Sequence, residues 1–64
     1  MKYLVECFYL DRLAPINEQE TAVSAKLIAD VDLVNYMTGE RQRVSKKYKT
    51  DVVWFITYPQ RSVD

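Results

Sequence analysis

The segment of residues 21–33, TAVSAKLIADVDL, constrains the fold more than any other part of this chain. Its odd-numbered positions are apolar after Thr21, whereas its even-numbered positions are mostly polar, with Ile28 as the main exception. Successive side chains of a β-strand point to opposite faces, so this alternation is typical of a half-buried strand. The pattern predicts a strand over about residues 21–34, with the apolar, odd-numbered positions facing the core.

A helix over about residues 18–38 is the alternative for the same segment. Asn17 and Glu20 resemble a capping box, and Gly39 is a residue type that often ends a helix. Residues 21–33 as a strand would span roughly 43 Å, whereas a domain of this size should be only about 28 Å across. A helix would fit that diameter. This alternative is an α+β fold, β-α-β-β, with the helix packed on a three-stranded antiparallel sheet.

Three further segments are expected to be strands, because β-branched and aromatic residues or alternating basic residues dominate them. The leading prediction is therefore a mainly β fold, a small antiparallel sheet or meander with strands at about 2–10, 21–34, 41–49 and 51–58. A chain of 64 residues has room for one domain. Its last residues, 59–64, are expected to form a loose C-terminal tail.

A hairpin turn is expected at residues 38–39, because glycine tolerates the positive φ that tight turns require. Folding the chain about this turn would place Asp30 opposite Lys47, and Lys26 opposite Asp51. Opposite charges would meet on one face and apolar residues on the other, which favours this register over one shifted by one residue.

Cysteine usage and hydropathy bear on the compartment. Cys7 is the only cysteine, so the chain can form no internal disulfide, which is typical of a reducing compartment. No stretch approaches the roughly 18 apolar residues that a membrane span needs. The N-terminal apolar stretch contains Glu6 and has no small-residue cleavage site, so a signal peptide is not expected. We expect a cytoplasmic protein in which Cys7 is a small buried hydrophobe.

Several residue types that catalysis relies on are missing. The chain has no histidine, which is the commonest general base and metal ligand. It has one cysteine, too few for a structural zinc site, and one glycine, too few for a phosphate-binding loop or a dinucleotide fingerprint. The sequence therefore predicts a protein that is not an enzyme, with no catalytic residue, no metal site and no cofactor.

Charge is divided unequally along the chain. Residues 1–40 hold three basic and seven acidic residues, a net charge of −4, whereas residues 41–64 hold six basic and two acidic residues, a net charge of +4. As a strand, residues 41–49 would present a row of bases suited to an acidic protein surface. Nucleic acid is the alternative partner. The bases could also have a purely structural role, if they only protect an exposed edge strand and pair with nearby acidic residues. The candidate partner-binding residues are Arg41, Arg43, Lys46, Lys47, Tyr48 and Lys49.

The aromatic residues raise a second question. Trp54 and Phe55 are neighbours, so in any strand they point to opposite faces, and one face needs cover from a helix or another molecule. A purely β fold would take that cover from a partner, most simply a second copy of itself. The candidate dimer or interface patch consists of Val53, Trp54 and Phe55.

These observations together predict a small non-enzymatic protein-binding module that acts as an inhibitor or adaptor of a macromolecular partner. Short chains without catalytic residues are common among phage and mobile-element proteins that bind a host factor, and we take this as the expected origin. Two other functions stay open: a nucleic-acid-binding protein that uses residues 41–49, with a tyrosine stacking on bases, and a structural subunit of a larger assembly.

Overall fold

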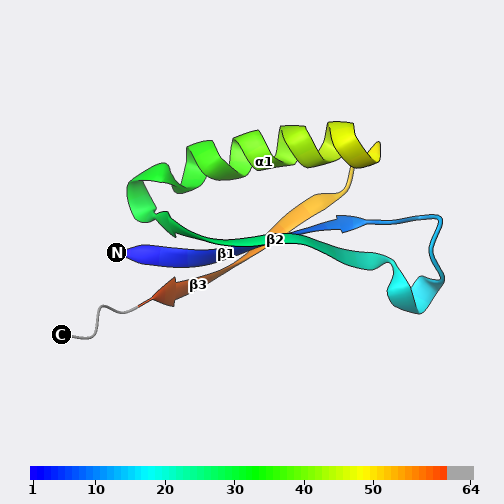
Figure 1. Ribbon diagram of the computed structural model, residues 1–64, viewed down its shortest axis with the longest axis horizontal. Coiled ribbons are helices and arrows are strands. Elements are labelled where there is room, and N and C mark those ends of the chain that lie inside the picture. The colour runs from blue at the N-terminus through cyan, green and yellow to red at the C-terminus, as the bar shows by residue number, and fades with distance from the viewer. Residues whose placement is uncertain (61–64) are drawn as a thin grey trace.

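The computed structural model describes residues 1–60 and contains one α-helix packed on a three-stranded sheet (Figure 1). In chain order the elements are β1 (Lys2–Leu10), the 3-10 turn η1 (Ile16–Glu18), β2 (Glu20–Ala29), the 3-10 turn η2 (Asp30–Asp32), α1 (Leu33–Tyr48) and β3 (Val53–Gln60). The body is elongated, 45 × 23 × 11 Å, with a radius of gyration of 13.2 Å. A compact domain of this length would have a radius of gyration of about 11 Å.

β1 is the central strand, and the strand order is β2-β1-β3. It pairs antiparallel with both neighbours, so β2 and β3 run parallel to each other on either side of it. Parallel strands need a crossover connection, and α1 provides it by crossing one face of the sheet (Figure 1). The result is a β-α-β unit split by the strand that precedes it in the chain.

Three of the expected strands are present, and the antiparallel sheet with one helix confirms the α+β alternative at the level of fold class. The strands expected at 2–10, 21–34 and 51–58 correspond to β1, β2 and β3, but β2 ends at Ala29, so the strand expected for residues 30–34 is wrong: they form η2 and the start of α1. Pro59 and Gln60, expected in the tail, are the last residues of β3, and the rest of that tail lies outside the described residues.

The strand expected at 41–49 is wrong, because residues 41–48 form the C-terminal half of α1. The hairpin turn at 38–39 is wrong for the same reason, since both residues lie inside this helix. The helix over 18–38 in the alternative is also misplaced, because its first half is β2 and the helix begins only at Leu33. The order of elements is therefore β-β-α-β.

β2 alternates as its sequence predicts. Val23 packs against the buried core as expected, but from Ala25 onward the face that we assigned to the core is wrong. Ser24, Lys26 and Ile28 share the side of their β1 partners that carries α1, whereas Ala25 and Leu27 point away from the helix. A β-bulge between Cys7 and Phe8 leaves Val23 as an extra residue in β2. The more polar face of β2 thus lies under the helix.

The connection between β1 and β2 is closed by hydrogen bonds of its own. The Asp11 amide donates to the Gln19 carbonyl over 2.9 Å, and the Asp11 carboxylate accepts a 3.1 Å bond from the Leu13 amide. This Asx-type turn and Pro15 give the loop a defined path. Leu13 and Ile16 remain almost fully exposed at its tip.

α1 has a narrow apolar face. Its half-buried or buried residues recur at the helical period, at Leu33, Tyr36, Met37, Glu40, Val44 and Ser45. Val44 is the only one that is fully buried, and Glu40 replaces an apolar residue in the middle of the row. Within residues 1–60, no helix has the length and apolar character to cross a membrane.

The helix ends at Lys49 rather than at the chain's glycine. Lys49 adopts the left-handed conformation with φ 52° and ψ 50°, and its amide donates to the Ser45 carbonyl. Left-handed C-caps are usually glycine, because a side chain makes this conformation costly. Thr50 then fixes the chain as it turns toward β3, since its hydroxyl donates to the Leu10 carbonyl over 3.3 Å and accepts the Val52 amide over 3.2 Å.

The core between α1 and the sheet is small. Five apolar residues are buried: Val5, Cys7, Ile28, Val44 and Val53. None of them is aromatic, although aromatic residues are the largest apolar side chains that the chain has. Cys7, expected to be a small buried hydrophobe, is fully buried and contributes to this core.

Candidate protein interface

The two faces of the sheet differ in what covers them. Alternation along β1 sends one set of side chains, which includes Val5 and Cys7, beneath α1, and sends the other set to the opposite side. Among the described residues no helix or strand lies on that opposite side (Figure 1). We call it the open face, and it comprises Leu4, Glu6, Phe8, Leu10, Ala22, Ala25, Leu27, Trp54, Ile56 and Tyr58.

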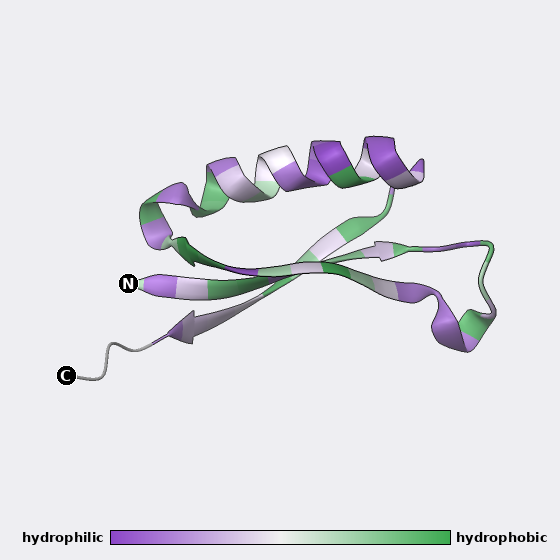
Figure 2. Ribbon diagram, viewed as in Figure 1, coloured by the Kyte–Doolittle hydropathy of each residue, from purple (hydrophilic) through white to green (hydrophobic). Residues whose placement is uncertain are grey.

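The open face is predominantly apolar, and hydrophobic residues recur along all three strands (Figure 2). The row through Leu4 is its most exposed part, because Leu27 is paired with Leu4 from one side and Tyr58 from the other. Leu27 is 54% exposed and Tyr58 43% exposed. Ile56, opposite the next β1 residue on this face, is 41% exposed. Large apolar side chains therefore form a continuous solvent-exposed surface across three strands.

Aromatic stacking organises one end of the open face. The rings of Phe8 and Trp54 lie on directly paired positions of β1 and β3, with centroids 5.7 Å apart and planes inclined by 14°. Such offset stacking stabilises a pair by about 0.5–1.5 kcal/mol beyond the area it buries. This end of the face is therefore rigid and partly shielded, while the end around Leu4 is the more accessible.

Glu6 is the single charged residue in the middle of the open face. Interaction with the Glu6 carboxylate raises the pKa of Tyr58, which lies on the same face, above its ordinary value. The carboxylate thus interacts with a polar group of the open face.

The interface patch predicted from the sequence, Val53, Trp54 and Phe55, is divided between the two faces. Val53 is buried beneath α1 and packs with Cys7, so it is not available to a partner. Phe55 is half-buried on the same side, with the guanidinium of Arg41 5.4 Å from its ring centroid. Only Trp54 lies on the open face.

One of the predicted partner-binding bases, Arg41, holds α1 on the sheet, and another, Arg43, pairs within the helix. Arg41 Nη1 donates a 2.6 Å hydrogen bond to the Val53 carbonyl. Arg43 makes a two-pronged ion pair with Glu40, with distances of 2.6 and 3.0 Å. Because residues 41–48 are helical rather than extended, the predicted row of bases along a strand does not form. The guanidinium groups of Arg41 and Arg43 already have partners within the fold.

Glu40 is a structural residue that the sequence reasoning missed. Its carboxylate accepts a 3.0 Å bond from the Ser24 hydroxyl as well as the bonds from Arg43, and so it connects α1 to β2. The Arg43 guanidinium holds the pKa of Glu40 below its ordinary value. The available signal was the spacing of four residues between Glu40 and Val44, which places both on one face of a helix.

The remaining predicted bases gather at the C-terminal end of α1. Lys46, Lys47 and Lys49 are exposed there, where positive charge is favourable beside the free carbonyls of the helix end. Tyr48 stacks on Tyr9 with centroids 4.3 Å apart.

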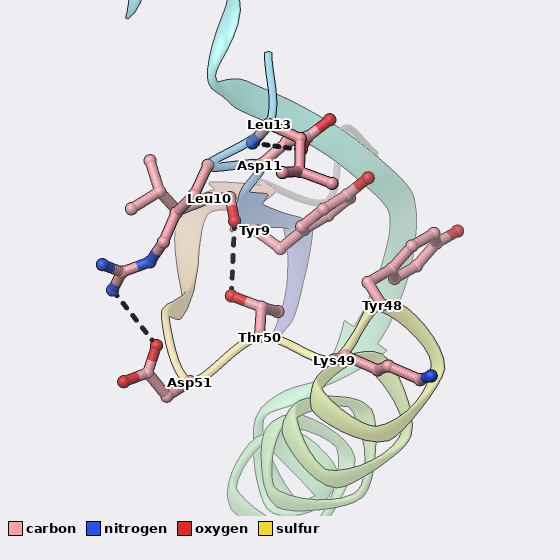
Figure 3. A pocket seen from close by; sticks show the side chains of 9 residues that line it. Tyr9, Leu10, Asp11, Leu13, Tyr48, Lys49, Thr50 and Asp51 are labelled. Carbon is pink, nitrogen blue, oxygen red and sulfur yellow. Dashed lines mark hydrogen bonds and ion pairs between the residues drawn. The ribbon is translucent and has the colours of Figure 1, made fainter.

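An open groove of about 370 Å³ lies beside this end of the helix, between the end of β1 and the turn after α1 (Figure 3). An ion pair between Arg12 and Asp51, 3.2 Å long, lies at the side of the groove. Lys49 is on its lining, whereas Lys46 and Lys47 are not. The structure therefore brings the three lysines together at one end of α1, next to a shallow groove.

The need for cover on one face was recognised from Trp54 and Phe55, but most residues of the open face were not identified. β1 and β3 carry apolar residues at both parities, which is the pattern of strands covered on both faces. Residues 1–60 contain one α-helix, and a single helix covers a single face.

Comparison of the chain with protein-family models, with curated proteins and with solved structures finds no match.

Proposed function

We propose that this protein is a non-enzymatic protein-binding module and that the open face is its binding surface. One observation carries the proposal: a sheet with large apolar side chains on both faces has a helix on only one of them. Contiguous exposed apolar surface of this kind marks interaction sites in soluble proteins. The role of inhibitor or adaptor, expected from the sequence, is compatible with a module that acts by occupying a partner's surface.

The exposed area supports the proposal. A folded chain of 7.5 kDa is expected to expose about 4,250 Å², and this chain exposes 4998 Å². The excess of roughly 750 Å² is close to the share of one partner in a standard protein–protein interface, about 800 Å². Elongation and the bare sheet face both contribute to this excess.

The lysines at the end of α1 support a second binding surface. Lys46, Lys47 and Lys49 are exposed and close together, and no ion pair within residues 1–60 engages them. An acidic protein surface is the partner that matches them. The charges would mainly increase the rate and the specificity of association with that surface. Replacing all three by glutamate should abolish such binding, and binding to nucleic acid at low salt would instead favour the nucleic-acid alternative.

Site-specific photo-crosslinking in the expressing cell tests the open face. A benzophenone side chain at Ile56 or Leu27 would lie on the open face, and the matched control at Val34 would lie on α1, where the residue is 73% exposed. We expect covalent protein adducts from the two open-face positions and few from Val34. Equal yields from all three positions would show that the open face is ordinary surface and would reject the proposal.

A further inference from the structure

The structure also indicates what occupies the open face. Resting on the function proposed above, we propose that the occupant is a second copy of this chain, packed face to face about a two-fold axis with the β1 strands antiparallel. The product is a sandwich of two sheets with the two helices on the outside. Facing sheets pack about 10 Å apart with their strands inclined by about 30°.

The open face is a surface that a two-fold dimer can use. Specific protein–protein interfaces bury at least about 1,200 Å² in total, so each copy would cover about 600 Å² or more of its open face. The open face extends along three paired strands, and its centre is the central strand itself. A two-fold axis that lies in the plane of contact and crosses this strand at Leu4 sets the row of Leu27, Leu4 and Tyr58 against the same row of the second copy.

The charge of the molecule favours self-association. The formal net charge of the chain is zero, so two copies do not repel each other as two strongly charged molecules would. The open face carries no strong charge of one sign, since Glu6 is the one charged residue in its interior and Lys2 lies on the same side of β1. A strongly charged partner would match the lysines of α1 better than it would match this face.

Two charged residues of β1 select the antiparallel orientation. Lys2, Leu4 and Glu6 follow one another on the same side of the central strand. With antiparallel β1 strands and an axis at Leu4, Lys2 of each copy lies opposite Glu6 of the other. A parallel orientation places lysine opposite lysine and glutamate opposite glutamate, which is unfavourable. The axis at Leu4 also lies in the most exposed row of the face, between Leu27 and Tyr58.

Sedimentation equilibrium of the purified chain tests the dimer. We expect a mass twice that of the 7.5 kDa chain, a single-chain mass for Ile56→Lys, and the double mass for the matched helix control Val34→Lys. Circular dichroism checks that each variant is folded, and Leu27→Lys on an edge strand replaces Ile56→Lys if that variant does not fold. A single-chain mass for the wild type at all concentrations, or a folded Ile56→Lys variant that stays dimeric, would overturn the proposal.

This outcome separates the dimer from the proposed function. If the wild type is monomeric while the Ile56 photo-probe captures a different protein, the second copy is rejected and the binding module stands. If the probe captures nothing selectively, the binding module is rejected too.

A charge exchange tests the orientation. Lys2→Glu and Glu6→Lys should each weaken dimerisation about fivefold, as for a partly exposed ion pair, and the double variant Lys2→Glu/Glu6→Lys should restore it. A double variant as weak as the singles would overturn the antiparallel arrangement.

Discussion

The covered and open faces of the sheet both carry large apolar side chains but differ in what lies on them. On the covered side, Val5, Cys7 and Val53 are buried beneath α1, and Phe55 packs against this cluster. On the open side, Phe8 and Trp54 stack on paired positions, and no helix of residues 1–60 covers them. This difference in cover is the basis for the proposal that a second molecule completes the burial.

This asymmetry also explains the small core. Full burial of a valine or isoleucine side chain contributes about 1.5–3 kcal/mol, and only five of residues 1–60 are buried. A domain of this size is marginal even when well packed. Cover over the open face would supply the apolar burial that the helix side lacks.

Adjacent residues of β2 give the sharpest contrast and the largest expected effect. Ile28→Ala, on the covered face where the residue is 8% exposed, should destabilise the fold by about 2–4 kcal/mol at any protein concentration. Leu27→Ala, on the open face, should lower the free energy of unfolding little in dilute solution and more as protein concentration rises, because Leu27 is expected to pack against another molecule. Urea unfolding of both variants at low and high concentration measures this, and equal costs at both concentrations would remove the distinction between the faces.

The next prediction concerns the polar link beneath the helix. Glu40→Gln should destabilise the fold by about 1 kcal/mol at neutral pH, because the ion pair with Arg43 is lost and the bond to Ser24 is weakened. The pKa of Glu40 is lowered in the folded state, so its contribution is present above its ordinary value and is lost as pH falls through the lowered value. Chemical unfolding between neutral and acid pH should show the two proteins converging at low pH, and a constant difference would contradict this role.

The smallest expected effect lies on neither face. Gly39 is exposed within α1, its φ is not positive, and a Cβ at this position would meet no atom within 4 Å. Gly39→Ala should therefore raise the free energy of unfolding by about 0.5–1 kcal/mol through helix propensity alone. Thermal unfolding measures the gain, and a loss would mean that this side of the helix is packed against a neighbour.

The strands of this fold could be predicted from the sequence, whereas the helix could not. The β-branched and aromatic runs of β1 and β3 and the alternation of β2 are strong local signals. The signal of α1 is weak, because Glu40 interrupts its apolar face, Gly39 resembles a turn, and its C-terminal half is rich in bases. Its end at Lys49 carries no glycine and gives no stop signal.

The sequence predicted an apolar interface, but it did not predict which residues form it. The apolar parity of β2 was recognised, yet it was assigned to the core because a sequence does not show which face receives the helix. The Ser24–Glu40 bond and the bulge at Val23 place the more polar side of β2 under α1, which leaves Ala25 and Leu27 outside. Tertiary contacts decide which face of β2 lies under α1, and local periodicity does not determine those contacts.

Thermal unfolding over a hundredfold range of protein concentration tests the central claim most directly. If a second copy covers the open face, folding is coupled to association, and the melting temperature should rise by about 10 °C from the lowest to the highest concentration. A melting temperature that is independent of concentration, for a chain that unfolds reversibly, would contradict the account and show that the sheet is stable with one face bare.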